Sequence, residues 1–200
     1  MREWWLRTLL VLSAPRPVFV ALRQDTNEEA EKRAEPVLLV VWLAGMAFVL
    51  ATRTTAHLMD GADAPHGIVV AVWAFLAGGL FGGIAYWLLG GVLYRVAVAL
   101  GSQGSYRRAR HVVAFAAVPV ALSLVLWPFK LALYGNAVFH RGGRDAGGGG
   151  HVLEVLLVAF LVWSAWLLVV GVRAVHGWTW ARAAAAAAAP IVLAAAFVLA

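Results

Sequence analysis

The sequence contains no cysteine, and only 10 of its 200 residues are acidic. Without cysteine the chain can form no disulfide, no thiolate nucleophile and no thiolate metal site. Charged residues make up 13% of the chain and hydrophobic residues 63%. A water-soluble fold of this length would have too little polar surface to cover itself. The composition therefore predicts an integral membrane protein.

Sequence motifs of enzymes are also missing. The chain has no His-Glu-x-x-His and no Gly-x-Ser-x-Gly, which would mark metal-assisted or serine hydrolysis. The glycine-rich stretch 141–150 neither follows a strand nor leads into Lys-Ser/Thr, as a phosphate-binding loop does. We therefore expect no enzymatic activity and no cofactor. The net charge of +6 is spread over loops between apolar segments, so we expect no nucleic-acid partner.

Five apolar segments reach or approach the ~20 helical residues needed to cross ~30 Å of hydrocarbon. The third segment includes two prolines, which predict kinks. The second would measure about 50 Å as one helix, too short for two crossings and a turn, and we expect it to cross once, with a bend at Gly90-Gly91. The predicted fold is an all-α polytopic bundle of five transmembrane helices (36–200) behind an N-terminal segment (1–35). The five segments are about 36–52, 68–100, 111–133, 152–172 and 183–200.

The distribution of positive charge predicts the orientation. Five crossings put alternate loops on opposite sides, and twelve of the 16 lysines and arginines fall on the side of the N-terminus and of loops 101–111 and 173–182. The positive-inside rule then places the N-terminus in the cytoplasm and the C-terminus outside. Arginine outnumbers lysine fourteen to two, which is typical of a GC-rich coding sequence and indicates a bacterial cytoplasmic membrane.

The first 35 residues predict an amphipathic helix on the cytoplasmic membrane surface. Trp4, Trp5 and Leu9 recur at helical spacing beside Arg2, and a second short amphipathic piece is expected at 18–22. Aromatic rings favour the interface and arginines favour anionic lipid. We therefore expect a surface that binds lipid headgroups, with a protein partner or a second copy left open. Its residues are Trp4, Trp5, Phe19, Tyr106, Arg107, Arg108 and Arg110.

Glycines in segment 68–100 predict a helix-packing face. Gly78 with Gly82, and Gly79 with Gly83, form two small-xxx-small pairs, which allow the backbone of another helix to approach closely. We expect the partner helix to belong to the same bundle. Homodimerisation through this face is the alternative.

One loop contains a candidate metal-ligand set. His57, Asp60, Asp63 and His66 follow one another at intervals of three residues, and imidazole with carboxylate suits a divalent ion. A glycine and a proline within the run argue against a regular helix there. We expect solvated side chains and no metal, with a metal site as the alternative.

Four short motifs stand out along the chain: Pro-x-Pro-Val-Phe-x-x-Leu (15–22), Gly-x-x-Gly-Ser-Tyr-Arg (101–107), Val-Ala-Phe-Ala-Ala-Val-Pro (113–119) and a Trp-Leu-Leu…Gly-Val-Arg-x-Val-His-Gly…Ala-Arg-Ala stretch from residue 166. With these motifs the chain resembles the YIP family of Rab/Ypt-interacting membrane proteins, and in particular its bacterial branch. The resemblance covers roughly residues 15–200. It implies a five-helix membrane bundle with a partner-binding or membrane-organising role.

The residues leave two classes of function open. A scaffold requires a packed apolar interior, whereas a small-solute or lipid transport pathway requires a cavity with converging polar groups. The five segments place no acidic residue at the membrane midplane, where proton-coupled transporters keep an ionisable group. We therefore expect a scaffold, with the transport pathway as the alternative.

Overall fold

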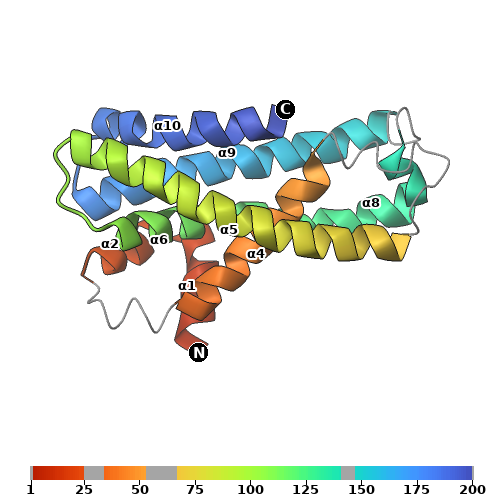
Figure 1. Ribbon diagram of the computed structural model, residues 1–200, viewed down its shortest axis with the longest axis horizontal. Helices are drawn as coiled ribbons and strands as arrows, with labels where there is room; N and C mark the ends of the chain where they lie inside the picture. Colours follow the sequence, from red (N-terminus) through yellow and green to blue (C-terminus); the bar gives the residue numbers. More distant parts are fainter. Residues whose placement is uncertain (1, 25–33, 53–66, 141–146, 200) are drawn as a thin grey trace.

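The structure is a computed structural model that describes residues 2–24, 34–52, 67–140 and 147–199. Within these ranges every regular element is a helix and no strand occurs, which confirms the all-α prediction. Figure 1 shows long helices lying side by side along one axis, with shorter N-terminal helices against one flank. Four apolar helical stretches of the described chain are long enough to cross a membrane, and a fifth is shorter.

The long stretches extend beyond the predicted segments at several ends. The helix α5 runs unbroken through Gly90-Gly91, so the bend expected there does not interrupt it. The shorter apolar stretch is Val37–Ala51, and its helix crosses α5 obliquely in Figure 1. The helices that correspond to the other four predicted segments are α4 (Ala34–Ala51), α5 (Gly67–Ala99), α9 (Gly148–His176) and α10 (Trp180–Leu199).

The third crossing is a series of short helices, as its two prolines predict. Pro119 falls at the start of a new helix directly after Ala117, because proline has no N–H to continue the preceding turn. The hydroxyl of Ser164 on α9 donates to the carbonyl of Ala116 at 2.7 Å, and that of Ser123 donates to Val120 at 2.6 Å. Side chains thus bind backbone carbonyls on both sides of Pro119. The series is α6 (Tyr106–Ala116), α7 (Val118–Leu122), η2 (Ser123–Val125), α8 (Leu126–Tyr134) and η3 (Gly135–Phe139).

Helices α4 and α5 cross in close backbone contact. A Cβ added at Gly45 of α4 would overlap backbone atoms of Gly78 and Gly82, and one added at Gly78 would lie 2.6 Å from the Cα of Met46. A Cβ added at Gly79 would lie 2.6 Å from the Trp42 ring, whereas one added at Gly83 would meet nothing within 4 Å. Three of the four glycines of the predicted packing face therefore lie against α4, and Gly83 faces open space.

In the described part of the chain, α4 is preceded by α1 (Arg2–Ser13) and α2 (Pro15–Gln24). The apolar side of α2 packs against α9 and α6. Val18 and Leu22 are buried with Phe19, whose ring lies edge-on to Phe115 with 6.5 Å between centroids. This short helix is part of the hydrophobic core, which also includes buried residues of α6, α9 and α10.

Candidate functional site

One end of the bundle concentrates positive charge. At this end the last turns of α5 and α9 and the first turns of α6 and α10 meet beside α2 (left in Figure 1). Glu154 is the single acidic residue among the side chains that the structure describes. It lies in the first turns of α9, near the end of the bundle opposite the arginines. We call the arginine-rich region the basic end. Its described arginines are Arg16, Arg23, Arg95, Arg107, Arg108, Arg110, Arg173 and Arg182.

Arg110 is enclosed by aromatic rings. Its guanidinium carbon lies 3.7 Å from the ring centroid of Trp87, 4.7 Å from that of Tyr106 and 5.2 Å from that of Tyr86. The Tyr106 hydroxyl donates to the Trp87 carbonyl at 2.9 Å. Gly90 leaves room for this contact, because a Cβ there would lie 3.0 Å from the Cα of Arg110. Cation–π stacking thus joins α6 to α5.

Two further arginines stack on tryptophans at the same end. The guanidinium carbon of Arg173 lies 4.4 Å from the Trp180 centroid, and that of Arg182 lies 4.4 Å from the Trp178 centroid. Arg182 also donates to the carbonyl of Leu100. These contacts join α9 to α10 and α10 to the loop after α5. In the sequence these two arginines indicate only the orientation, because the pairing of each with its ring depends on the tertiary fold.

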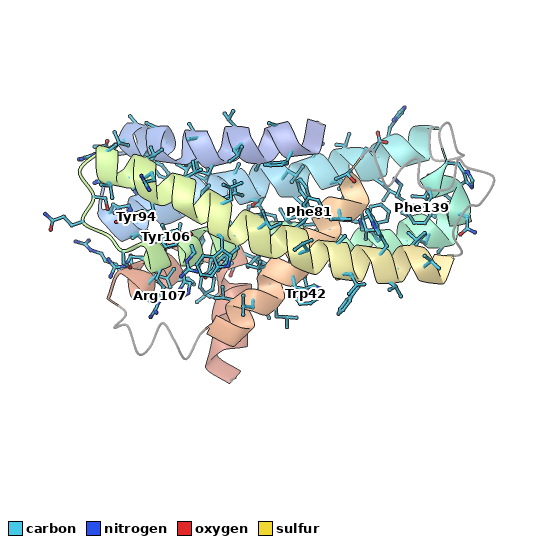
Figure 2. The ribbon with its side chains drawn as sticks, in the orientation of Figure 1. Trp42, Phe81, Tyr94, Tyr106, Arg107 and Phe139 are labelled. Carbon is cyan, nitrogen blue, oxygen red and sulfur yellow. The ribbon has the colours of Figure 1, made fainter. Side chains whose placement is uncertain are left out.

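Some residues of the predicted lipid-binding surface are buried or half-buried in the bundle. Phe19 was expected on it, and that expectation is wrong: its side chain has no exposed area. Its ring fills the space that Gly171 leaves on α9, where a Cβ would lie 2.8 Å from Phe19 Cε1. Tyr106 and Arg110 are half-buried in the aromatic contact described above. Arg107, which points outward in Figure 2, and Arg108 lie on the first turn of α6.

The remaining predicted site residues lie partly outside the described residues. Trp4 and Trp5 fall on α1, but their side chains are not among those described. His57, Asp60, Asp63 and His66 all lie in 53–66, outside the described ranges. Within the described ranges, no three histidine or acidic side chains converge as a metal site would require.

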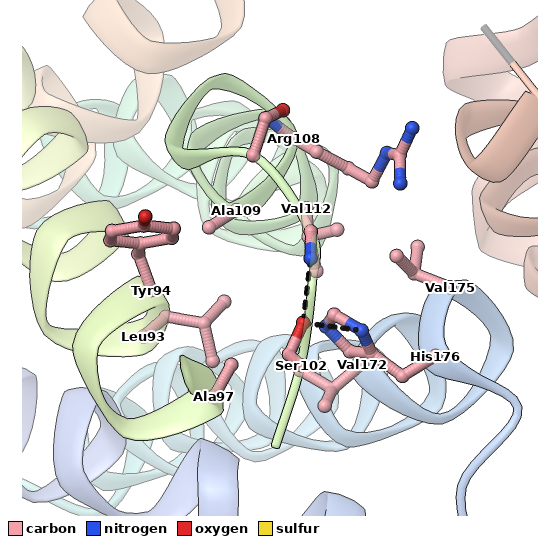
Figure 3. Close-up of a pocket in the computed structure, with 12 residues that line it drawn as sticks. Leu93, Tyr94, Ala97, Ser102, Arg108, Ala109, Val112, Val172, Val175 and His176 are labelled. Carbon is pink, nitrogen blue, oxygen red and sulfur yellow. Dashed lines mark hydrogen bonds between the residues drawn. The ribbon is translucent and has the colours of Figure 1, made fainter. Parts of the chain in front are cut away.

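A small recess opens between α5, α6 and α9 at the basic end, beneath the loop that joins α5 to α6 (Figure 3). Its floor is apolar and includes Leu93, Val112 and Val172, each at most 2% exposed. Its polar lining includes Ser102, Ser105, Arg108 and His176. The sequence analysis did not select Ser102 or His176, which are far apart in the chain.

A hydrogen-bond chain fixes the loop to the end of α9. The Ser102 Oγ accepts from the Gly104 N–H at 2.9 Å and lies 3.1 Å from His176 Nδ1. The His176 ring stacks on Trp178 with 4.5 Å between centroids. The adjoining Ser105 caps α6, because its Oγ accepts from the Arg108 N–H at 3.2 Å. Loop 101–105 is thereby held over the recess.

These features define a class of protein: an all-α, multi-pass membrane bundle with an arginine-rich end. The family model for the Yip1 domain matches residues 9–200. The chain therefore belongs to the Yip1 domain family, which confirms the resemblance to the YIP family. No curated protein matches the chain, and neither does any solved structure.

Proposed function

We propose that this protein is a scaffold of a bacterial cytoplasmic membrane, whose basic end faces the cytoplasm and binds anionic lipid headgroups. The observation that supports this proposal is the gathering of eight arginines at one end of the described chain, with Glu154 near the other. The inner leaflet is rich in anionic lipid, and each lysine or arginine near it contributes about 1 kcal/mol. The same charges favour the cytoplasmic orientation by the positive-inside rule.

The packing of the bundle favours a scaffold over a transport pathway. The core between α2, α6, α9 and α10 consists of valine, leucine, alanine and aromatic side chains. The buried polar residues of the described chain are Thr8, His111 and Ser123, and Ser123 donates to the carbonyl of Val120 in the preceding turn. Such an interior offers few groups that could replace the hydration of a polar solute.

Lipid retention across a salt series tests this proposal. The full chain is purified in a nonionic detergent, and co-purified lipids are quantified after washing at rising ionic strength. Because the Debye length falls from about 30 Å at 0.01 M to about 3 Å at 1 M salt, anionic lipid should be lost as salt rises while zwitterionic lipid is retained equally.

Matched variants make the test specific. Replacing Arg107 and Arg108 by glutamine should reduce the anionic lipid retained at low salt and flatten its salt dependence. A Lys130→Gln variant, which removes a charge near the opposite end on α8, is the control and should leave retention unchanged. If retention of anionic lipid depends neither on salt nor on these arginines, and the protein conducts solute in liposomes, the transport pathway would be favoured instead. Co-purification of an acidic protein in place of lipid would contradict the lipid assignment.

A further inference from the structure

The recess beneath loop 101–105 is surrounded by positive charge from three different helices. Arg108 of α6 lines the recess itself, and Figure 3 shows its side chain extending toward the side where Val175 and His176 lie. The Nη1 of Arg23 on α2 would lie 3.5 Å from a Cβ placed on Gly177, the residue after His176. Arg182 of α10 donates to the carbonyl of Leu100, where the loop begins.

Two of these cations, Arg23 and Arg108, differ from the stacked Arg110, whereas Arg182 stacks on Trp178. Arg110 lies against three aromatic rings, whose electron-rich faces compensate its charge. No aromatic ring stacks on Arg23 or Arg108 in the described chain, and none of its acidic side chains lies at this end. Clefts lined by like charges attract ions of the opposite sign.

Hydrogen-bond donors accompany the charges. If the Ser102 hydroxyl, which already accepts from the Gly104 N–H, donates to His176 Nδ1, the proton of the neutral imidazole resides on Nε2. No other described group forms a hydrogen bond with His176. Nε2 is then a donor at the recess that Arg108 also lines. Guanidinium and imidazole N–H groups both bind phosphate oxygens well.

The size of the recess limits where a ligand can lie. Its interior has room for about one water molecule, so a tetrahedral phosphate cannot enter it. The phosphate would occupy the mouth, between Arg108 and His176. At the mouth the acyl chains of a lipid remain in the bilayer, while the headgroup reaches the polar loop.

We infer that the mouth of this recess binds the phosphate monoester of a lipid headgroup, through Arg108, His176 and the neighbouring Arg23 and Arg182. The inference rests on the proposed function, because it names the headgroup class that the basic end would bind. A phosphate monoester carries about −1.5 to −2 charges at neutral pH, whereas a phosphodiester carries one. Several cations from separate helices therefore favour the monoester, and phosphatidic acid should bind better than phosphatidylglycerol.

Competition between these two lipids tests the inference. The full chain in nonionic detergent is mixed with equal amounts of phosphatidic acid and phosphatidylglycerol that have the same acyl chains. Native mass spectrometry then measures how much of the protein carries one molecule of each lipid. We expect about fivefold more phosphatidic acid, the preference that one further charge beside the arginines would produce. Inorganic phosphate is added in a separate titration and should displace phosphatidic acid only at large excess.

Two variants and a matched control localise the effect. Arg108→Gln and His176→Gln should each reduce the preference to about one. Arg95→Gln removes an exposed arginine from the same end that does not line the recess, so it should weaken both lipids alike and keep the preference. Elution volume and thermal unfolding in detergent establish that each variant is folded.

The outcomes separate this inference from the proposed function. Equal binding of the two lipids by the unchanged chain, or an equal loss of preference in Arg95→Gln and Arg108→Gln, would overturn the monoester site. If salt still released both lipids, the general role of the basic end would stand. Displacement of phosphatidic acid by inorganic phosphate at similar concentration would overturn the lipid assignment and indicate a soluble phosphate ligand.

Discussion

Replacing Phe19 by alanine should undock helix α2 from the bundle. The Phe19 side chain has no exposed area and fills the space beside Gly171, where a Cβ would lie 2.8 Å from Cε1 and 3.0 Å from Cζ of the ring. Removing a buried phenylalanine side chain costs about 3–5 kcal/mol, which includes the cavity that remains. Since 1.4 kcal/mol is tenfold in an equilibrium, docking should weaken by a factor on the order of 100 or more.

Thiol labelling can measure this change because the chain has no natural cysteine. A single cysteine placed at Leu22, which is 3% exposed on α2, should react slowly with a maleimide while α2 is docked. In the Phe19→Ala background the labelling rate should rise by about the same factor of 100, if opening is fast relative to labelling. Val20→Ala on the exposed side of α2 is the control and should leave the rate unchanged. Equal labelling rates in the two backgrounds would show that Phe19 does not hold α2 in place.

Three other predictions concern the α4–α5 packing, the stacking of Arg110 and the orientation of the chain in the membrane. Gly82→Leu should lower thermal stability in detergent by about 1–3 kcal/mol or more, because its side chain would overlap the α4 backbone, whereas Gly83→Leu faces open space and should be tolerated; equal effects would argue against the α4–α5 contact. Arg110→Gln should cost about 0.5–2 kcal/mol through lost stacking, and a loss no larger than that of Arg95→Gln would mean that the aromatic contacts contribute little. A cysteine at Gln103, which is exposed on loop 101–105, should resist a membrane-impermeant reagent in intact cells, and labelling from outside would contradict the proposed cytoplasmic orientation.

Hydropathy and proline positions predicted the apolar helices of the described chain, because both act locally along the chain. The long helices coincide with the apolar segments and extend beyond several of their ends, and Pro119 lies at the start of a new helix. The same local signals do not show which distant side chain compensates the interrupted helix. Ser164 donates to Ala116 from 48 residues away, and this contact follows from the packing of α9 against the third crossing.

The burial of Phe19 illustrates a similar limit. Amphipathic spacing in residues 18–22 is compatible with a helix lying on lipid and with a helix packed on protein, since both require one apolar face. In the structure the helix packs on protein, and this packing depends on Gly171, which leaves a space for the Phe19 ring. That glycine lies within an otherwise ordinary apolar segment.

The candidate site was predicted in part. Arg108 was selected from the charge next to the third crossing, and it lines the recess. Ser102 and His176 were not selected. His176 belongs to a motif that carried the family resemblance, whereas Ser102 falls at an unspecified position of another. Their contact spans 74 residues, and no periodicity in the sequence indicates that the loop after α5 meets the end of α9.

The position of bound anionic lipid on the full chain tests the central claim most directly. A phosphatidic acid analogue with a photoactivatable group beside its phosphate is reconstituted with the protein in liposomes, irradiated, and its crosslinks are mapped by mass spectrometry. We predict that crosslinks concentrate in residues 101–110 and 173–182, at the basic end. Crosslinks concentrated at the opposite end, around residues 130–140 and 147–154, or spread evenly along α5 and α9, would contradict the claim that the basic end binds anionic headgroups.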